Sequence, residues 1–145
     1  MGNNLTLDTG STLTVGGAGQ TVDVGNNLTA TSKGEILQTG TGSTLAVGGI
    51  AQLTAQNLAL VDQDITLANA TNDFGTVNIV NARDVRLRDS DGSIGIQGNI
   101  SGILDIRADG TNAGGYVITN PAELILMGTG ADQFRGSYGE CTLCV

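Results

Sequence analysis

Short stretches in which apolar and polar residues alternate recur along the whole chain, each placing two aliphatic side chains on one face. Alternation with a period of two is typical of a β-strand with one buried face. Turn sequences rich in Gly, Asn and Asp, such as DTGS and TGTGS, separate these stretches and tolerate positive φ angles. The pattern predicts strands at residues 5–7, 13–15, 22–24, 28–30, 45–47, 53–55, 58–60, 65–67, 77–79, 85–87, 94–96, 104–106 and 124–126.

A longer repeat favours a β-solenoid over a meandering antiparallel sheet. NNLT at residues 3–6 returns at 26–29. DITL at residues 64–67 returns as DVRL at 84–87 and as DIRA at 105–108, with nearly equal spacing. A period of about 20–23 residues that holds two or three strands is the size of one coil of a parallel β-helix. We therefore predict an all-β, single-stranded parallel β-helix.

The predicted solenoid is one domain over residues 1–145, with regular coils in 1–110 and an atypical C-terminal coil or cap in 111–145. STLTVGG at residues 11–17 returns as STLAVGG at 43–49. Because this offset matches neither one coil nor two, we expect the two copies on different faces of the solenoid. The chain has 23 Gly, one Pro and no Trp, which suits a narrow lumen filled by aliphatic side chains.

The charge balance restricts the partners that the chain could bind. With 14 acidic and 6 basic residues the net charge is −8, which argues against nucleic acid and anionic membrane surfaces. No apolar run approaches the roughly 18–20 residues of a membrane span, so no membrane insertion is expected. The first residues, MGNNLTLDTG, lack the basic and apolar segments of a signal peptide, so we expect a fragment or a mature segment.

The chain contains no His, which removes the commonest general base and the Ser–His and Cys–His nucleophilic systems. We therefore expect no enzymatic activity and no cofactor. Charged residues nevertheless gather in one region, and the repeat predicts Asp84 over Asp105 and Arg86 over Arg107. One interpretation is a solvated face with ion pairs worth about 0–1 kcal/mol each, and the other is a ladder that binds a glycan or an acidic ligand. The cluster comprises Arg83, Asp84, Arg86, Arg88, Asp89 and Asp91, with Asp105 and Arg107 one coil on.

Two further motifs lie near the C-terminus. GTGADQF at residues 128–134 matches much of a calcium-binding nonapeptide, but Ca²⁺ needs six to eight oxygens, so we expect no metal at a lone copy. Cys141 and Cys144 form a C-x-x-C pair, which could be a small disulfide loop, two free thiols, a reactive pair that links chains, a tether at the C-terminus, or half of a metal site. A structural zinc site needs two more Cys or His ligands, which the sequence lacks.

The segment DITLANATNDFGTVNIVNARDVRLRDSDGSIGIQGNISGILDIRADG at residues 64–110 resembles the repeats of large secreted bacterial exoproteins of the filamentous haemagglutinin type, in the two-partner secretion family. NNLTATSKGEILQTG and STLAVGGIAQLTA before it are similar to the same repeats, so the resemblance covers roughly residues 3–110. It implies a right-handed β-helix that is an internal or C-terminal segment of a secreted adhesin at the bacterial cell surface. The implied partner is a host-surface glycan or a protein receptor.

Three functions follow from these expectations. The first is a structural and adhesive segment of such an exoprotein. The second is a self-assembling extracellular fibre subunit, because an uncapped solenoid end exposes N–H and C=O groups to which another copy can add strands. The third is a carbohydrate-binding or carbohydrate-active β-helix that uses the region from Arg83 to Arg107.

Overall fold

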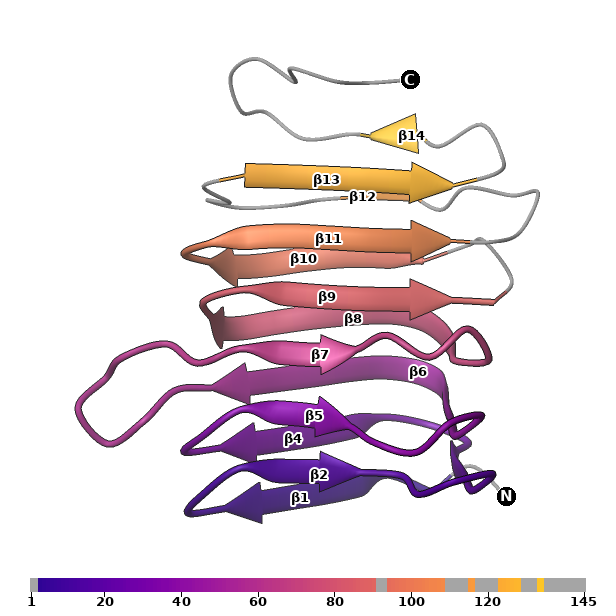
Figure 1. Ribbon diagram of the computed structural model, residues 1–145, viewed down its shortest axis with the longest axis horizontal. Coiled ribbons are helices and arrows are strands. Elements are labelled where there is room, and N and C mark those ends of the chain that lie inside the picture. The colour runs from indigo at the N-terminus through magenta and orange to yellow at the C-terminus, as the bar shows by residue number, and fades with distance from the viewer. Residues whose placement is uncertain (1–2, 91–93, 109–114, 117–122, 129–132, 135–145) are drawn as a thin grey trace.

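The computed structural model describes residues 3–90 and 94–108, together with three strands beyond them, and this part of the chain is all β (Figure 1). Within the described residues no helix forms, so none is available that could span a membrane. The strands are β1 (Leu5–Thr9), β2 (Leu13–Val15), β3 (Thr21–Val24), β4 (Leu28–Ser32), β5 (Ile36–Gln38), β6 (Thr44–Ala55), β7 (Ile65–Leu67), β8 (Asp73–Ala82), β9 (Val85–Asp89), β10 (Gly95–Ile100), β11 (Ile103–Ala108), β12 (Gly115–Tyr116), β13 (Glu123–Gly128) and β14 (Gln133–Phe134).

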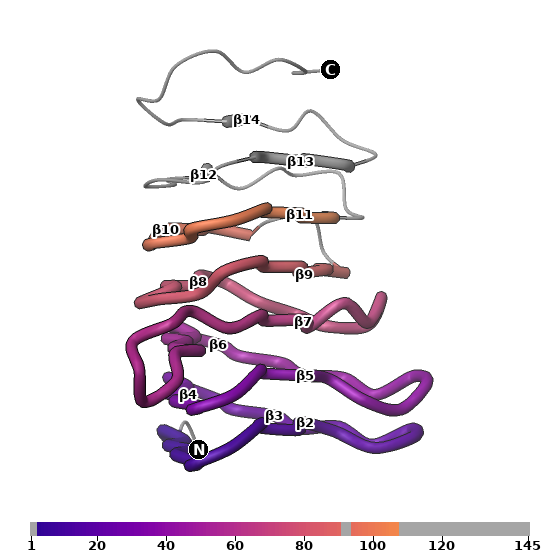
Figure 2. Tube along the Cα trace, turned by 60° about the vertical axis from the view of Figure 1, so that its left-hand side comes forward, coloured from indigo at the N-terminus to yellow at the C-terminus, as the bar shows by residue number. Residues whose placement is uncertain are grey.

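The strands form two parallel sheets that the chain visits in turn. Sheet A has the order β1-β4-β6-β8-β10-β12-β14, with β3 also paired to β6, and sheet B has the order β13-β11-β9-β7-β5-β2. Figures 1 and 2 show the strands from β1 to β11 stacked as successive layers along the chain. The predicted all-β fold with stacked parallel strands is confirmed.

Coil length is regular at first and then varies. In sheet A, Leu5 pairs with Leu28 and Leu28 with Ala51, so the first two coils have the same length. The next coil, from Ala51 to Val77, is longer, and the one from Val77 to Ile96 is shorter. The NNLT repeat therefore reports a true coil, while later coils gain or lose residues in the turns and at register shifts within the strands.

The core fills the space between the two sheets with stacked aliphatic side chains. Ile36 pairs with Ile65, Ile65 with Val85 and Val85 with Leu104, so one row of sheet B carries a β-branched or Leu side chain in every coil. All four side chains are buried. Each contributes about 1.5–3 kcal/mol of hydrophobic stabilisation when fully removed from water.

The structure confirms one prediction about the repeats, adds one strand that was not predicted and corrects one predicted strand. STLTVGG contains β2 in sheet B and STLAVGG opens β6 in sheet A, so the two copies lie on different faces. The strand β5 at Ile36–Gln38 was not predicted, because a single apolar pair follows Glu35 there. The predicted strand at residues 58–60 is wrong, because these residues form a loop whose apolar side chains are exposed.

Neutral polar side chains fill the corner where sheet B leads into sheet A. Asn72 is fully buried, and its amide exchanges two 2.7 Å hydrogen bonds with the amide of Gln38. Asn72 Oδ1 also accepts the N–H of Leu45, and its Nδ2 donates to the Leu67 carbonyl. Ser43, which is also fully buried, accepts from Asn69 Nδ2 at 2.6 Å. We call Gln38, Ser43, Asn69, Thr71 and Asn72 the amide corner.

Asparagine side chains bonded to the backbone of the next coil help to set the register in sheet A. Asn4 Oδ1 accepts the N–H of Asn27 at 3.2 Å, and Asn27 Oδ1 accepts the N–H of Ile50 at 2.9 Å. Each Asn side chain therefore satisfies a backbone donor of the coil above. A Cβ at Gly49 would collide with the Asn27 side chain, so β6 requires glycine where its register with β8 shifts.

Candidate functional site

Sheet B sends charged side chains outward because its strands keep the period of two. In β9, Val85 and Leu87 are buried while Arg86 is exposed. In β11, Leu104 is buried while Arg107 is exposed. The outer face of sheet B therefore carries Arg86, Arg88, Asp105 and Arg107, as the sequence predicts.

The register between β9 and β11 corrects the predicted stacking of these charges. Asp105 pairs with Arg86 and Arg107 with Arg88, whereas Asp84 precedes β9 and lies opposite Ile103. The coil from β9 to β11 is thus shorter than the spacing of the sequence repeat, and the register differs by two positions. A shift of this size keeps every side chain on its face but changes its neighbour.

In this register Arg86 lies beside Asp105, which is an attractive pair, and Arg88 lies beside Arg107, which brings two like charges together. Arg86 Nε lies 3.0 Å from Asp105 Oδ2, with the two side chains 63% and 25% exposed. Ion pairs this exposed contribute about 0–1 kcal/mol, since solvent screens them. The pair therefore orients both side chains more than it stabilises the fold.

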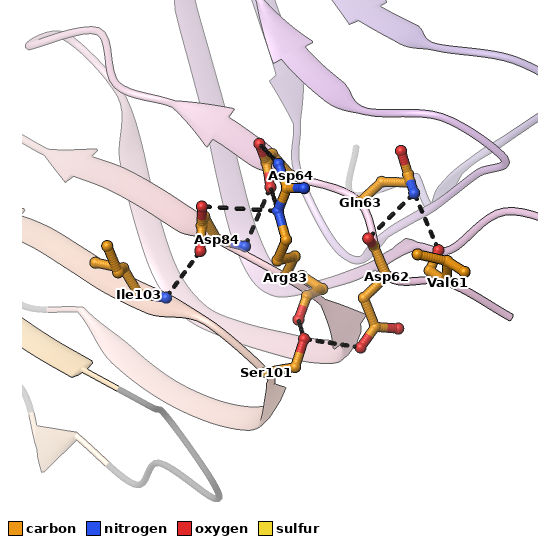
Figure 3. Close-up of polar contacts among 9 residues, drawn as sticks. Val61, Asp62, Gln63, Asp64, Arg83, Asp84, Ser101 and Ile103 are labelled. Carbon is orange, nitrogen blue, oxygen red and sulfur yellow. Dashed lines mark hydrogen bonds and ion pairs between the residues drawn. The ribbon is translucent and has the colours of Figure 1, made fainter.

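Asp64, Arg83 and Asp84 gather at the corner where sheet A leads into sheet B (Figure 3). The Arg83 guanidinium binds the Asp64 carboxylate through two bonds, Nε to Oδ1 at 2.8 Å and Nη2 to Oδ2 at 2.6 Å. Arg83 Nε also lies 3.7 Å from Asp84 Oδ2. The hydrogen bonds and charge of Asp64 raise the pKa of Arg83 above its ordinary value. Arg83 is therefore cationic at any pH at which the protein would be studied.

The aspartates of this corner also hold backbone donors of the coil above. Asp64 Oδ1 accepts the N–H of Asp84 at 3.3 Å, and Asp84 Oδ1 accepts the N–H of Ile103 at 2.9 Å. This arrangement repeats that of Asn4 and Asn27 in sheet A, with carboxylates in place of amides. It explains why Asp recurs at the start of DITL and DVRL.

Two members of this corner carry no sequence signal. Asp62 Oδ2 accepts the hydroxyl of Ser101 at 3.0 Å, although the two residues are 39 positions apart (Figure 3). Neither belongs to a repeat, so only the fold could bring them together. We call Asp62, Asp64, Arg83, Asp84 and Ser101 the charged corner.

The outer face of sheet B is shallowly hollowed in two places. A depression of about 280 Å³ is lined by Arg86, Arg88, Asp105 and Arg107, together with Ala68 and Leu87. Another of about 180 Å³ lies between Asp64, Asp84 and Asp105. Both are open to solvent, so they suit a ligand that lies along the surface. Among the described residues, no group of three or more His, Cys, Asp or Glu is placed to hold a metal ion.

The remaining candidates fall elsewhere. The sequence places Asp89 among the outer charges, but in the structure it continues the inward positions of β9 and is fully buried. Its Oδ1 accepts the N–H of Phe74 at 2.8 Å. Asp91, Cys141 and Cys144 lie outside the described residues, as does the centre of the GTGADQF motif.

Comparison with known proteins bears on the coils just described. A family model for repeats of unknown function, DUF5649, matches residues 2–81, which is more than half of the 145 residues. The chain belongs to the DUF5649 family. The DUF5649 match runs from β1 into β8, and β9 and β11 continue sheet B in the same parallel pairing. No curated protein and no solved structure matches the chain.

The DUF5649 family model confirms that the chain is built from repeats, as the equal length of its first coils indicates. It does not extend to the filamentous haemagglutinin type. That part of the resemblance, with the secretion and adhesion that it implies, stays a prediction.

Proposed function

We propose that the chain is a structural and adhesive segment of a secreted bacterial surface exoprotein, without enzymatic activity. The observation that carries the proposal is the unbroken stack of parallel strands, in which each coil is bonded to the next along the axis. Such a stack makes a stiff support, since every coil is held by backbone hydrogen bonds and by a continuous core. The side chains on its outer faces can then serve recognition.

The outer face of sheet B is the proposed adhesive surface. Four of the six basic residues of the chain, Arg83, Arg86, Arg88 and Arg107, lie on this face or at its edge. Guanidinium groups bind carboxylate and sulfate groups in a bidentate way, which favours an acidic host-surface glycan as the ligand. A shallow open depression suits holding such a chain, whereas catalysis is favoured by an enclosed site that excludes water.

A glycan array tests the adhesive part of the proposal. We expect the protein to bind sulfated or sialylated glycans, and the double variant Arg86→Gln with Arg107→Gln to bind them at least tenfold more weakly. Lys33→Gln removes a basic residue near β4 and serves as the matched control, with wild-type binding expected. Binding to no glycan, or equal binding by the double variant, would contradict the proposal.

A self-assembling fibre subunit is a second candidate, and the first strands of each sheet favour it. In the described chain β1, β2 and β3 each pair on one side only. Leu5, Leu7, Leu13 and Val22 of these strands are only partly buried. An edge with unpaired N–H and C=O groups beside apolar side chains is a template for further strands.

Sedimentation velocity across a wide concentration range tests this candidate. Assembly is expected to be lost in Val22→Lys, which places a charge at the half-buried edge, but to persist in Val80→Lys. Val80 is an exposed apolar residue of β8, inside the stack. A wild-type protein that stays monomeric at the highest concentration would remove the fibre function.

A further inference from the structure

The segment between β6 and β7 projects from the side of the solenoid (Figures 1 and 2). In sheet B, Leu13 pairs with Ile36 and Ile36 with Ile65, so the second of these coils is the longer. The additional residues lie in the connection from β6 to β7. We call residues 56–63 the apolar loop.

Hydrogen bonds within the apolar loop give it a fixed shape. Asn57 Oδ1 accepts the N–H groups of Ala59 and Val61, at 2.9 and 3.0 Å. The Asn57 carbonyl accepts the N–H of Leu60, and the Asn57 N–H donates to the Val61 carbonyl. Gln56 and Asp62 close the base of the loop through an antiparallel bridge. The loop is thus preorganised.

The loop is also fastened to a distant coil. Asp62 Oδ1 accepts from Gln56 Nε2 at 2.9 Å, while Asp62 Oδ2 accepts from Ser101 at 3.0 Å. One carboxylate therefore joins the loop to the turn between β10 and β11. This contact fixes the orientation of the loop relative to the charged corner (Figure 3).

What this fixed shape presents to solvent is aliphatic. Leu58, Leu60 and Val61 are 85%, 76% and 54% exposed, and Ala59 between them is exposed as well. Single exposed apolar residues are ordinary, but a run of four on one projecting loop is typical of an interaction site.

The backbone conformation of Leu60 also supports an interaction site. Its φ is +59°, and it is the one residue other than glycine with a positive φ in the described part of the chain. Glycine or asparagine adopts this conformation more readily than leucine. A leucine held there and pushed into water has no role in the core, and backbone strain of this kind clusters at functional sites.

We propose that the apolar loop is a docking element that inserts into an aliphatic pocket with a basic rim on a partner protein. The basic rim follows from the charges at the base of the loop. Asp62, Asp64 and Asp84 lie there, and Arg83 is paired with the latter two. The chain as a whole carries a net charge of −8. A pocket bordered by Lys or Arg complements both the apolar tip and this excess of carboxylates.

Two other binding partners for the apolar loop fit its surrounding charges less well. A second copy of the chain would bring the same negative charge to the contact. An anionic bilayer would repel it in the same way. The inference does not depend on glycan binding, because the arginines of sheet B and the tip of the apolar loop are different residues.

A phage-displayed random peptide library, selected on the folded protein, is the probe. We expect enriched peptides to combine aliphatic or aromatic residues with Lys or Arg. Their affinity should fall at least tenfold for Leu58→Ser with Leu60→Asn, since asparagine keeps the positive φ but removes the apolar side chain. Val80→Thr, which removes an exposed apolar side chain from β8, should bind the peptides as the wild type does.

Several results would overturn the proposal. These are no enriched peptides, enriched peptides without basic residues, or peptides that bind the loop variant as well as the wild type. Binding to phosphatidylcholine vesicles that depends on the apolar loop would show that its partner is a bilayer. A dimer in sedimentation that depends on the apolar loop would show that its partner is a second copy of the chain. Circular dichroism confirms that each variant is folded. The Arg86→Gln with Arg107→Gln variant should keep its peptide binding, which separates this site from the adhesive face.

Discussion

The two corners of the solenoid satisfy their polar groups by opposite means. In the amide corner the side chains are neutral and Asn72 is fully removed from water. The charged corner is built mainly from carboxylate side chains and a guanidinium, and the Arg83 and Asp64 side chains are 56% and 24% exposed. A buried amide with all its partners costs little, whereas a buried unpaired charge costs much more.

Both corners nevertheless do the same structural task. Asn72 Oδ1 holds the N–H of Leu45 in the coil below, and Asp84 Oδ1 holds the N–H of Ile103 in the coil above. Each contact ties a side chain of one coil to the backbone of the next. The difference lies in how much the protein loses when the contact is removed, because water can replace the partner at one corner and not at the other.

The largest effect is therefore expected at Asn72. Asn72→Ala leaves the Gln38 amide and the Leu45 N–H without their partner in a buried site, and should lower the free energy of unfolding by about 3 kcal/mol. Chemical denaturation measures the change. Gln97→Ala, at an exposed position of β10, is the control and should stay within about 0.5 kcal/mol of wild type. Equal losses at the two positions would mean that the amide corner is not buried as described.

At the charged corner, two substitutions of Asp84 separate the effect of its hydrogen bond to the Ile103 N–H from the effect of its charge. Asp84→Ala removes the acceptor for the Ile103 N–H and should cost about 1 kcal/mol in denaturation experiments. Asp84→Asn keeps an oxygen in place and should lose clearly less. If the Asn variant lost as much as the Ala variant, the carboxylate charge and not the hydrogen bond would be what matters.

The apolar loop, which leads into the charged corner, offers a stabilising change. Leu60→Gly relieves the positive φ at an exposed site. After the entropy cost of glycine is subtracted, we expect the free energy of unfolding to rise by about 0.5–1 kcal/mol, which a higher melting temperature would report. Ala59→Gly, at the preceding position and without a positive φ, should instead lower stability. A destabilised Leu60→Gly variant would show that the Leu60 side chain supports the fold.

The smallest effect is expected at Arg83. Arg83→Gln breaks two solvent-exposed ion pairs, so its loss should be smaller than that of Asp84→Ala and should shrink further as salt is added. The raised pKa of Arg83 contributes stability that is fully present below its unfolded pKa and is lost only as pH rises through the still higher folded value. Denaturation from about pH 5 to 9 should therefore show the same difference between wild type and variant throughout.

The repeats in the sequence located the coils because they have a physical cause. NNLT recurs one coil on since Asn4 and Asn27 each hold a backbone donor of the next coil. Asp64 and Asp84 recur for the same reason. The repeat gave the wrong position at Asp105. The residue of the next coil that lies opposite Asp84 is Ile103, and the tetrapeptide DIRA begins two positions later, at Asp105.

Alternation of apolar and polar residues predicted most strands and the side chains that face outward, but it also predicted one strand wrongly. It placed Arg86 and Arg107 on the outer face, but it also predicted a strand at residues 58–60, where the local bonds of Asn57 form a loop. Period-two alternation cannot distinguish a strand from a short loop with exposed leucines. The bond between Asp62 and Ser101 depends on a contact between distant coils that no local pattern encodes.

The length of β6 has a consequence for how the chain folds. β6 runs from Thr44 to Ala55, pairs with both β3 and β4 on one side, and pairs with β8 on the other. Every strand pair in the described chain joins strands at most three places apart in chain order, so the fold can grow coil by coil from any starting point. Because β6 is paired along both edges, with β3 and β4 on one side and β8 on the other, it should open only when the strands on both sides separate from it. Amide hydrogen exchange should then be slowest along β6 and faster toward β1 and β2.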